Sequence, residues 1–253
     1  MKTWQKLALL ILIPVAVLAF GIWRINVARN RQPVVVPQTN QEPTVTQDDT
    51  VMPRKLYIDS LQSARALVGK PVWIQAGYEL SYFPYSGHRI DLGHSAGVLP
   101  SVQRLDVTDI VTQKAPASLA DRITHGDKQV FAVFTMSGSD KQYATPIGFI
   151  QGSDSTYYCD TLFYYDDPHQ MYHFWPANIW QAIDQHQPIV GMNELQTQMA
   201  VGVVEQSDSS NYGNRTVDYD AGPKQWQVTF ENDKATQVQQ QPAQQQPSAP
   251  AAK

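Results

Sequence analysis

The sequence predicts an α+β fold: an N-terminal transmembrane helix, a small antiparallel β-barrel-like unit, and then two helices on a three-stranded antiparallel sheet. Three observations lead to this prediction. An uncharged apolar run opens the chain, short strand patterns separated by turn residues fill residues 71–165, and helical patterns precede strand patterns after residue 167. With 253 residues, 42% of them hydrophobic, the chain is long enough for one or two domains with a real core.

The first element is a candidate membrane anchor. Residues 7–23 are 17 residues without a charge, and as a helix they would span about 26 Å. Trp4 and Trp23 flank the run, as aromatic residues do at the two bilayer interfaces. A cleaved signal peptide ending near Ala19 is the alternative. The acidic body favours an extracytoplasmic side, so the sequence predicts a single-pass protein of the bacterial inner membrane with a periplasmic body.

Changes in composition predict the domain boundaries. Residues 1–31 are the anchor with a short cytoplasmic tail, and residues 32–52 form a Pro/Gln-rich linker. The folded body comprises a β-rich unit over residues 53–166 and a helical plus β-meander unit over residues 167–238. Residues 239–253 form a disordered tail rich in Gln, Pro and Ala.

The β-rich unit opens with a helix over residues 59–69, with Asp59 as its N-cap and Gly69 as its end. A short helix also fits residues 117–123. Val130 to Phe134 are apolar on both faces, so their strand is predicted to be central. The strands are expected over residues 71–76, 79–83, 105–111, 129–136, 142–150 and 156–165.

The second unit begins at Asp167-Pro168, where the Asp can cap a helix and the proline fits its first position. A further helix is predicted over residues 177–186. Another covers residues 194–201, with Asn193 as N-cap and Gly202 as stop. Strands follow over residues 216–220, 225–231 and 235–238, and a tight turn at Asn232-Asp233 joins the last two.

Four short motifs near the end of the chain carry a family resemblance. They are Gly191-Met192-Asn193-Glu194, the later Gly202, Thr216-Val217-Asp218-Tyr219 and Val228-Thr229-Phe230-Glu231. Together, over residues 177–238, they resemble the SmpA/OmlA (BamE-like) module. The resemblance implies two helices on a three-stranded antiparallel sheet, in a small non-catalytic protein that assists assembly of other envelope components. Asn193 stands where the family has Thr, and the lipid-anchor cysteine is missing.

Composition excludes other classes of protein. The 19 Lys and Arg residues against 23 Asp and Glu give a net charge of −4, so no nucleic-acid partner is expected. The single cysteine, Cys159, excludes an intramolecular disulfide and a cysteine-based zinc finger, and we expect it to be buried. The chain has no phosphate-binding loop and no dinucleotide fingerprint, so we expect no cofactor.

Two histidines form the strongest candidate for chemistry. His169 and His173 are four residues apart, so on a helix they share a face and could hold a metal, with Asp166 or Asp160 completing the site. The structural interpretation is favoured, because Asp167-Pro168 already starts a helix and no Glu lies between the histidines. We therefore expect no metal site.

A second polar cluster lies in the loop over residues 87–95. It contains His88, Asp91, His94 and Ser95, but no Gly-x-Ser-x-Gly elbow is present in the chain. A Ser-His-Asp triad is recognised by geometry rather than by closeness in sequence. Polar residues on the rim of a sheet are the preferred interpretation, and we expect no catalytic residues.

Aromatic residues are dense between residues 157 and 180. Tyr164, Tyr165 and Tyr172 are candidates for a binding surface, because Tyr and Trp dominate interface hot spots. A core at the junction of the two units is the alternative. Tyr164 and Tyr165 point to opposite faces of a strand, so one of them is a candidate for exposure.

Together these observations predict a membrane-anchored, non-enzymatic binding or scaffold protein of a bacterial-type cell envelope. Its expected partners are the membrane and an envelope protein or peptide, and assistance with envelope protein assembly is the function that the resemblance implies. The alternative is an envelope hydrolase that uses a metal held by His169 and His173.

Overall fold

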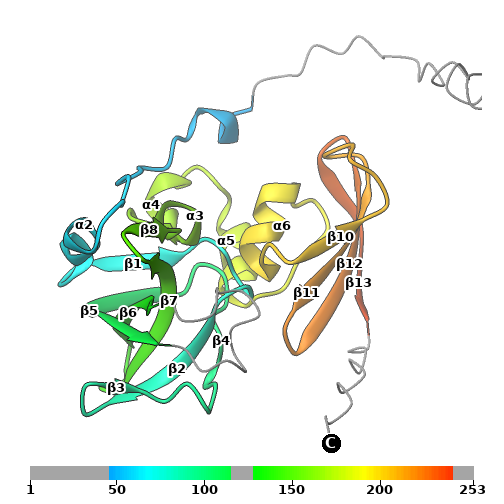
Figure 1. Ribbon diagram of the computed structural model, residues 1–253. Helices are drawn as coiled ribbons and strands as arrows, with labels where there is room; N and C mark the ends of the chain where they lie inside the picture. The colour runs from blue at the N-terminus through cyan, green and yellow to red at the C-terminus, as the bar shows by residue number, and fades with distance from the viewer. Residues whose placement is uncertain (1–45, 115–127, 242–253) are drawn as a thin grey trace, which may run out of the picture. The chain divides into compact units, whose positions relative to one another are not determined.

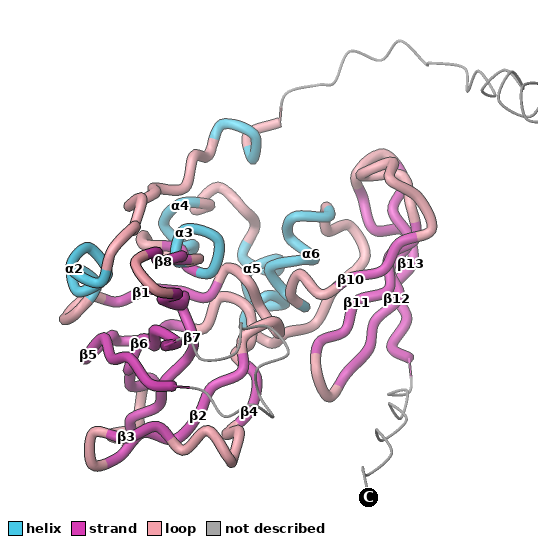
Figure 2. The backbone as a smooth tube through the Cα atoms, in the orientation of Figure 1, coloured by secondary structure: helices cyan, strands magenta, loops and turns pink. Residues whose placement is uncertain are grey.

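The computed structural model describes residues 46–114 and 128–241 of the chain (Figure 1). The fold is mostly β, with 41% of the described residues in strands and 19% in helices, and the strands form two antiparallel sheets. The predicted α+β class is therefore wrong. The helices are too short to make up as much of the fold as the strands do. The longest described helices, α5 and α6, have eight residues each, whereas strand β5 has eleven. Figure 2 shows the short helices beside the long strands.

The larger sheet has nine strands in the order β3-β2-β7-β6-β5-β1-β9, with β4 paired to β2 and β8 to β7. Its path has two free ends, so the predicted barrel-like unit is an open sheet. The strands are β1 Pro71–Ile74, β2 Ser81–Ser86, β3 Arg89–Ile90, β4 Gly97–Val98, β5 Arg104–Lys114, β6 Lys128–Met136, β7 Gln142–Gln151, β8 Asp154–Tyr157 and β9 Phe163–Tyr164.

Strand β6 lies between β5 and β7, and both of its faces are buried. Val130, Ala132 and Phe134 belong to one core cluster, whereas Phe131 and Val133 belong to another on the opposite face. This alternation confirms the prediction of a central strand, because a strand covered on both faces is apolar throughout.

Two of the predicted local elements differ in detail. The helix expected over residues 59–69 is a short helix, α2 Leu61–Ala64, continued by the 3-10 turn η2 Arg65–Leu67. Ser60 and Ser63 form a capping box there, so Ser60 replaces Asp59 as the N-cap. The strand expected over residues 156–165 is interrupted by α3 Cys159–Leu162. The predicted helix over residues 117–123 lies outside the described residues.

The second sheet follows three helices, α4 Pro168–Met171, α5 Ala177–Asp184 and α6 Glu194–Val201. The Asp167 and Asn193 caps are confirmed, because each side chain accepts a hydrogen bond from the backbone of its helix. The sheet order is β10-β11-β12-β13, four strands instead of the predicted three. Its strands are β10 Glu205–Ser207, β11 Thr216–Ala221, β12 Lys224–Glu231 and β13 Lys234–Gln241.

The β12–β13 turn also confirms its prediction. Asn232 and Asp233 have φ values of +52° and +55°, the left-handed conformation that a tight two-residue hairpin turn requires. Strand β13 continues to Gln241, so the first residues of the predicted disordered tail are paired with β12. The rest of that tail lies outside the described residues.

A close backbone contact joins the loop after β1 to the end of α6. Val203 N donates to Gly77 O at 3.3 Å, and a Cβ on Gly202 would lie only 2.5 Å from the same oxygen. Gly202 also has a φ of +89°, which side-chain-bearing residues rarely adopt. All described residues from Gln47 onward belong to one compact unit, which contains both parts of the predicted body.

Within residues 46–114 and 128–241, we find no helix whose length and hydrophobicity would let it cross a bilayer. This finding contradicts the predictions of a transmembrane helix, a single-pass inner membrane protein and a membrane partner. Residues 7–23, on which these predictions rest, lie outside the described residues.

Candidate functional site

The three candidate metal ligands have separate partners. The ring nitrogens of His169 lie 3.2 Å from Asp167 Oδ1 and 3.1 Å from Asp184 Oδ1. His173 Nδ1 is 3.0 Å from the Gln170 carbonyl oxygen, and Asp166 pairs with Arg54 at 2.9 Å. Among the residues that the structure describes, no group of three or more His, Cys, Asp or Glu side chains could hold a metal.

His169 and His173 instead line an open surface pocket of about 560 Å³. The His169 ring stacks on Trp180 with 4.0 Å between the ring centroids. Trp175 and Trp180 also line the pocket, but both are largely buried, and their indole nitrogens donate to Asp48 and to the Tyr172 carbonyl. The pocket is therefore the outer edge of an aromatic core.

The polar side chains of residues 87–95 also have separate partners. Asp91 Oδ2 lies 2.9 Å from His94 Nδ1, and this contact is the main reason that the pKa of Asp91 is lowered. Ser95 Oγ bonds to the backbone of Gly97, so the hydroxyl shapes its own turn. Neither side chain of the Asp91–His94 pair is buried, and no contact joins it to Ser95 among the described residues.

The three candidate surface tyrosines are buried, with exposed fractions of 5% for Tyr164, 7% for Tyr165 and 3% for Tyr172. The expectation that Tyr164 and Tyr165 point to opposite faces agrees with their packing, because they belong to two different core clusters. Core covers both faces at this point, so neither ring is left exposed. They therefore form no binding surface.

Asp160 anchors an extended segment that precedes α2. Its carboxylate accepts hydrogen bonds from Leu56 N at 3.0 Å, Tyr57 N at 2.9 Å and the Tyr165 hydroxyl at 2.7 Å. Burial by itself would raise the pKa of Asp160, but these hydrogen bonds, with the charge of Lys55, outweigh burial and lower it. The neighbouring thiol of Cys159 is buried as expected, which raises its pKa to about 12.

Replacing Asp160 with alanine should lower the free energy of unfolding by about 2 to 3 kcal/mol at neutral pH, because three donors lose a charged acceptor. The lowered pKa means that the ionised carboxylate stabilises the fold above its ordinary pKa. That stabilisation is lost as the pH falls through the folded-state value. Urea unfolding between pH 7 and pH 3 should therefore show the difference from wild type shrinking in acid.

The control for this change is Asp140→Ala in an exposed turn, which should alter stability by no more than about 0.5 kcal/mol. A difference for Asp160→Ala that stays constant with pH would contradict the proposed role of its charge.

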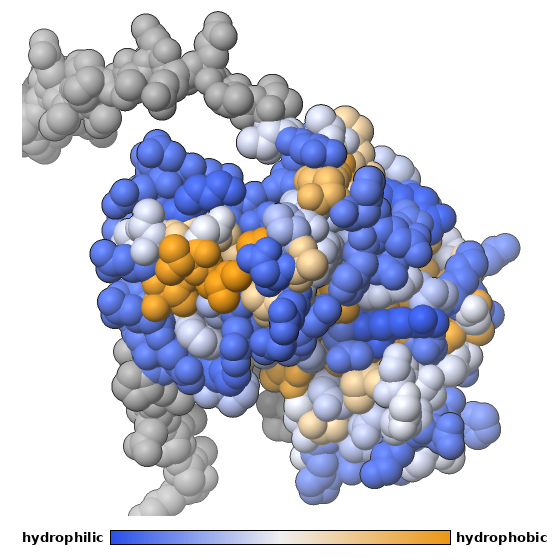
Figure 3. All heavy atoms as spheres, turned by 180° about the vertical axis from the view of Figure 1, so that it is seen from behind, coloured by the Kyte–Doolittle hydropathy of each residue, from blue (hydrophilic) through white to orange (hydrophobic). Residues whose placement is uncertain are grey.

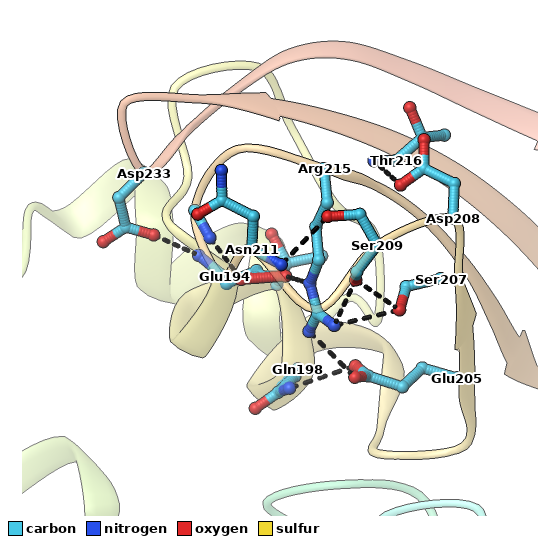
Figure 4. Close-up of polar contacts among 12 residues, drawn as sticks. Glu194, Gln198, Glu205, Ser207, Asp208, Ser209, Asn211, Arg215, Thr216 and Asp233 are labelled. Carbon is cyan, nitrogen blue, oxygen red and sulfur yellow. Dashed lines mark hydrogen bonds and ion pairs between the residues drawn. The ribbon is translucent and has the colours of Figure 1, made fainter. Parts of the chain in front are cut away.

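The most deeply buried charges of the described residues form a network around Arg215 (Figure 4). The Glu194 side chain is 0% exposed, and that of Arg215 is 10% exposed. Arg215 Nε donates to Glu194 Oε1 at 2.5 Å, and its Nη2 donates to Glu205 Oε1 at 3.0 Å. Gly213 N donates to the second oxygen of Glu194 at 2.8 Å. Both oxygens of the buried carboxylate are therefore satisfied.

Local structure explains how these charges meet. Glu194 is the first residue of α6, where the helix dipole favours an acidic side chain. Glu205 begins β10 and Arg215 immediately precedes β11, and these strands are paired. The acceptors Glu194 and Glu205 raise the pKa of Arg215 even though burial opposes this, so its guanidinium stays charged.

The network holds the loop between β10 and β11, residues 208–214, which we call the 208–214 loop. Where the loop leaves β10, Arg215 Nη1 donates to Ser207 Oγ at 3.0 Å and to Ser209 O at 3.4 Å. At the end of the loop, Asp233 N donates to Gly213 O and Asn232 N donates to the Asn214 side chain, both at 2.8 Å. The loop is thus tied to a helix, to two strands and to the β12–β13 turn.

Tyr212 is the most prominent side chain of the 208–214 loop. It is 52% exposed, and its ring lies 5.5 Å from the guanidinium carbon of Arg215. The rest of the loop is Asp208, Ser209, Ser210, Asn211, Gly213 and Asn214. The loop therefore displays an aromatic ring, hydroxyls and amides, while the charges of the network are used inside the protein.

No local pattern in the sequence singles out Arg215 or Glu205, and the predicted site residues do not include Tyr212. A Glu in the first turn of a helix and an Arg before a strand are ordinary surface features, and only the fold brings them together. The Ser-Ser-Asn-Tyr-Gly run at residues 209–213 was an available signal, because this composition is typical of binding loops. Comparison of the chain with protein-family models, with curated proteins and with solved structures finds no match.

Proposed function

We propose that this protein is a non-enzymatic binding or scaffold module that presents the 208–214 loop, with Tyr212 at its centre, to a protein partner. The observation that carries the proposal is the buried pair of Glu194 and Arg215, whose hydrogen bonds to Gly213 N and Ser209 O anchor a loop made mostly of polar residues. Binding by a preordered loop avoids part of the entropy cost of association.

The composition of the loop supports a protein partner. Tyr, Ser, Gly and Asn are the residues that antibody paratopes use, because a tyrosine gives a large contact area at a small entropy cost and the others hydrogen-bond adaptably. On the face shown in Figure 3, hydrophobic residues reach the surface in limited patches within polar surroundings. Such a surface suits a polar, separable contact better than a permanent apolar one.

The order of elements supports the resemblance to the SmpA/OmlA (BamE-like) module, which we keep as part of the proposal. Helices α5 and α6 precede an antiparallel meander, β11-β12-β13, and the additional strand β10 carries Glu205 of the network. The 208–214 loop follows this additional strand. We infer that this chain adds its own binding loop to a scaffold of that kind and assists the assembly of envelope components.

A photo-crosslinking amino acid placed at residue 212 tests the proposal in cells. We expect a discrete crosslinked protein adduct, and we expect Tyr212→Ala to weaken binding of the captured partner about 30-fold, which is typical of a hot-spot aromatic residue. Melting temperature should stay near that of the wild type, because the ring is half exposed.

The control places the same crosslinker at Tyr57, another aromatic residue, 78% exposed in the segment before α2. That position should give no adduct of the same mass. Equal crosslinking at both positions, or none at residue 212, would rule out the 208–214 loop as the binding surface.

A further inference from the structure

Strand β13 is one edge of the second sheet, and part of this edge is already covered. Ala235 N donates to Met192 O at 2.7 Å, and Gly191 N donates to Ala235 O at 2.8 Å. The segment before α6 therefore closes the first part of the edge. Beyond Ala235, the strand runs to Gln241 with no such cover among the described residues.

The register of the sheet shows which backbone groups remain free. Phe230 N donates to Arg215 O, so alternate residues of β12 counted back from Phe230, namely Val228 and Trp226, also bond toward β11. The residues between them bond toward β13. Gln227 and Gln239 then form a hydrogen-bonded pair, and Val238 and Gln240 direct their backbone groups outward. These outward groups have no partner in the part of the chain that the structure describes.

The open edge lacks the usual protection against pairing. Natural edge strands are commonly blocked by charges, proline or a bulge. The bulge of this hairpin lies at Thr236, the unpaired residue of β13 opposite Thr229/Phe230, and the strand beyond it, residues 237–241, contains neither a charge nor a proline. Pro242 follows and has no backbone N–H, so the open edge is only a few residues long.

We propose that the β13 edge binds the β13 edge of a second copy of this chain, in an antiparallel pair centred on Gln239. In this arrangement Val238 faces the partner's Gln240, and Gln240 faces the partner's Val238. The pair forms about four backbone hydrogen bonds, which use the outward groups of Val238 and Gln240 on both edges. In each copy, the covered end at Ala235 and the proline at residue 242 limit the length of edge that can pair.

Side chains favour a second copy over an unrelated strand. Gln225, Gln227, Gln237, Gln239 and Gln241 lie on the outward, polar face of the sheet, in rows across β12 and β13. Pairing two copies extends the rows, with Gln239 opposite the partner's Gln239. An amide both donates and accepts, so identical rows complement one another without like-charge repulsion.

Sedimentation equilibrium on the full chain, over a range of concentrations, tests this proposal. We expect reversible dimerisation of the wild type. Gln239→Lys and Gln239→Glu should each weaken the dimer about fivefold, since like charges then face each other across the symmetry axis. An equimolar mixture of the two variants should recover wild-type association, because opposite charges then meet.

Gln206→Lys is the matched control, since Gln206 is an exposed glutamine in β10 at the opposite edge of the same sheet. It should dimerise like the wild type. Hydrogen exchange at the Val238 and Gln240 amides should slow as the concentration rises. A chain that stays monomeric up to about millimolar concentration, which is the weak end of measurable affinity, would overturn the proposal. A dimer that neither Gln239 variant weakens would overturn it as well.

Discussion

Replacing Gly202 with alanine should lower the free energy of unfolding by about 3 to 5 kcal/mol, from steric overlap together with an unfavourable φ. The new Cβ would lie 2.5 Å from Gly77 O and 2.7 Å from the Tyr78 ring, and Gly202 has a φ of +89°. The backbone oxygen cannot rotate away as a flexible side chain could. Denaturant unfolding followed by fluorescence should give a clearly lower midpoint.

Gly138→Ala is the control for a positive φ without a steric overlap. Gly138 has a φ of +81°, but a Cβ there would meet no atom within 4 Å. It should therefore lower stability by only about 1 kcal/mol, the cost of the backbone conformation alone. Equal losses for the two variants would show that the contact between Gly77 and Gly202 is not tight.

Replacing Arg215 with methionine should lower the free energy of unfolding by about 3 to 5 kcal/mol, because it leaves the Glu194 carboxylate buried without a counter-ion. Methionine retains an apolar side chain of similar reach, so the loss reports mainly on the charge. The 208–214 loop should also become mobile, which limited proteolysis between Ser207 and Arg215 would detect.

The matched control is Arg104→Met. Arg104 pairs with Asp106 at 2.8 Å, but both side chains are about half exposed, so its loss should change stability by no more than about 1 kcal/mol. Glu194→Gln combined with Arg215→Met should be less harmful than the sum of the single changes. Additive losses would mean that the two residues stabilise the protein independently.

Several elements were predictable because neighbouring residues determine them. Asp167 and Asn193 cap their helices with their own side chains, and Asn232-Asp233 adopts the φ values that a tight turn needs. The apolar residues on both faces of β6 indicated a central strand. Each of these features depends on a few consecutive residues, so the signal was complete in the sequence.

Other features depend on contacts between distant residues. Asp160 accepts hydrogen bonds from Leu56 and Tyr57, more than a hundred positions away. The chain turns into α3 beside this contact, within the strand predicted over residues 156–165. Strand β10 exists only by pairing with β11, because three residues cannot form an element alone. No local pattern could have shown either outcome.

The sequence by itself determined the Asp167 and Asn193 caps, the β12–β13 turn, the central strand and the burial of Cys159, because these follow from local geometry and hydrophobicity. Only the tertiary structure decided that Tyr164 and Tyr165 are both buried, and that Glu194, Glu205 and Arg215 converge. A tyrosine or a charged side chain is equally compatible with surface and interior. Its environment depends on which distant segments pack against it, and that choice belongs to the fold as a whole.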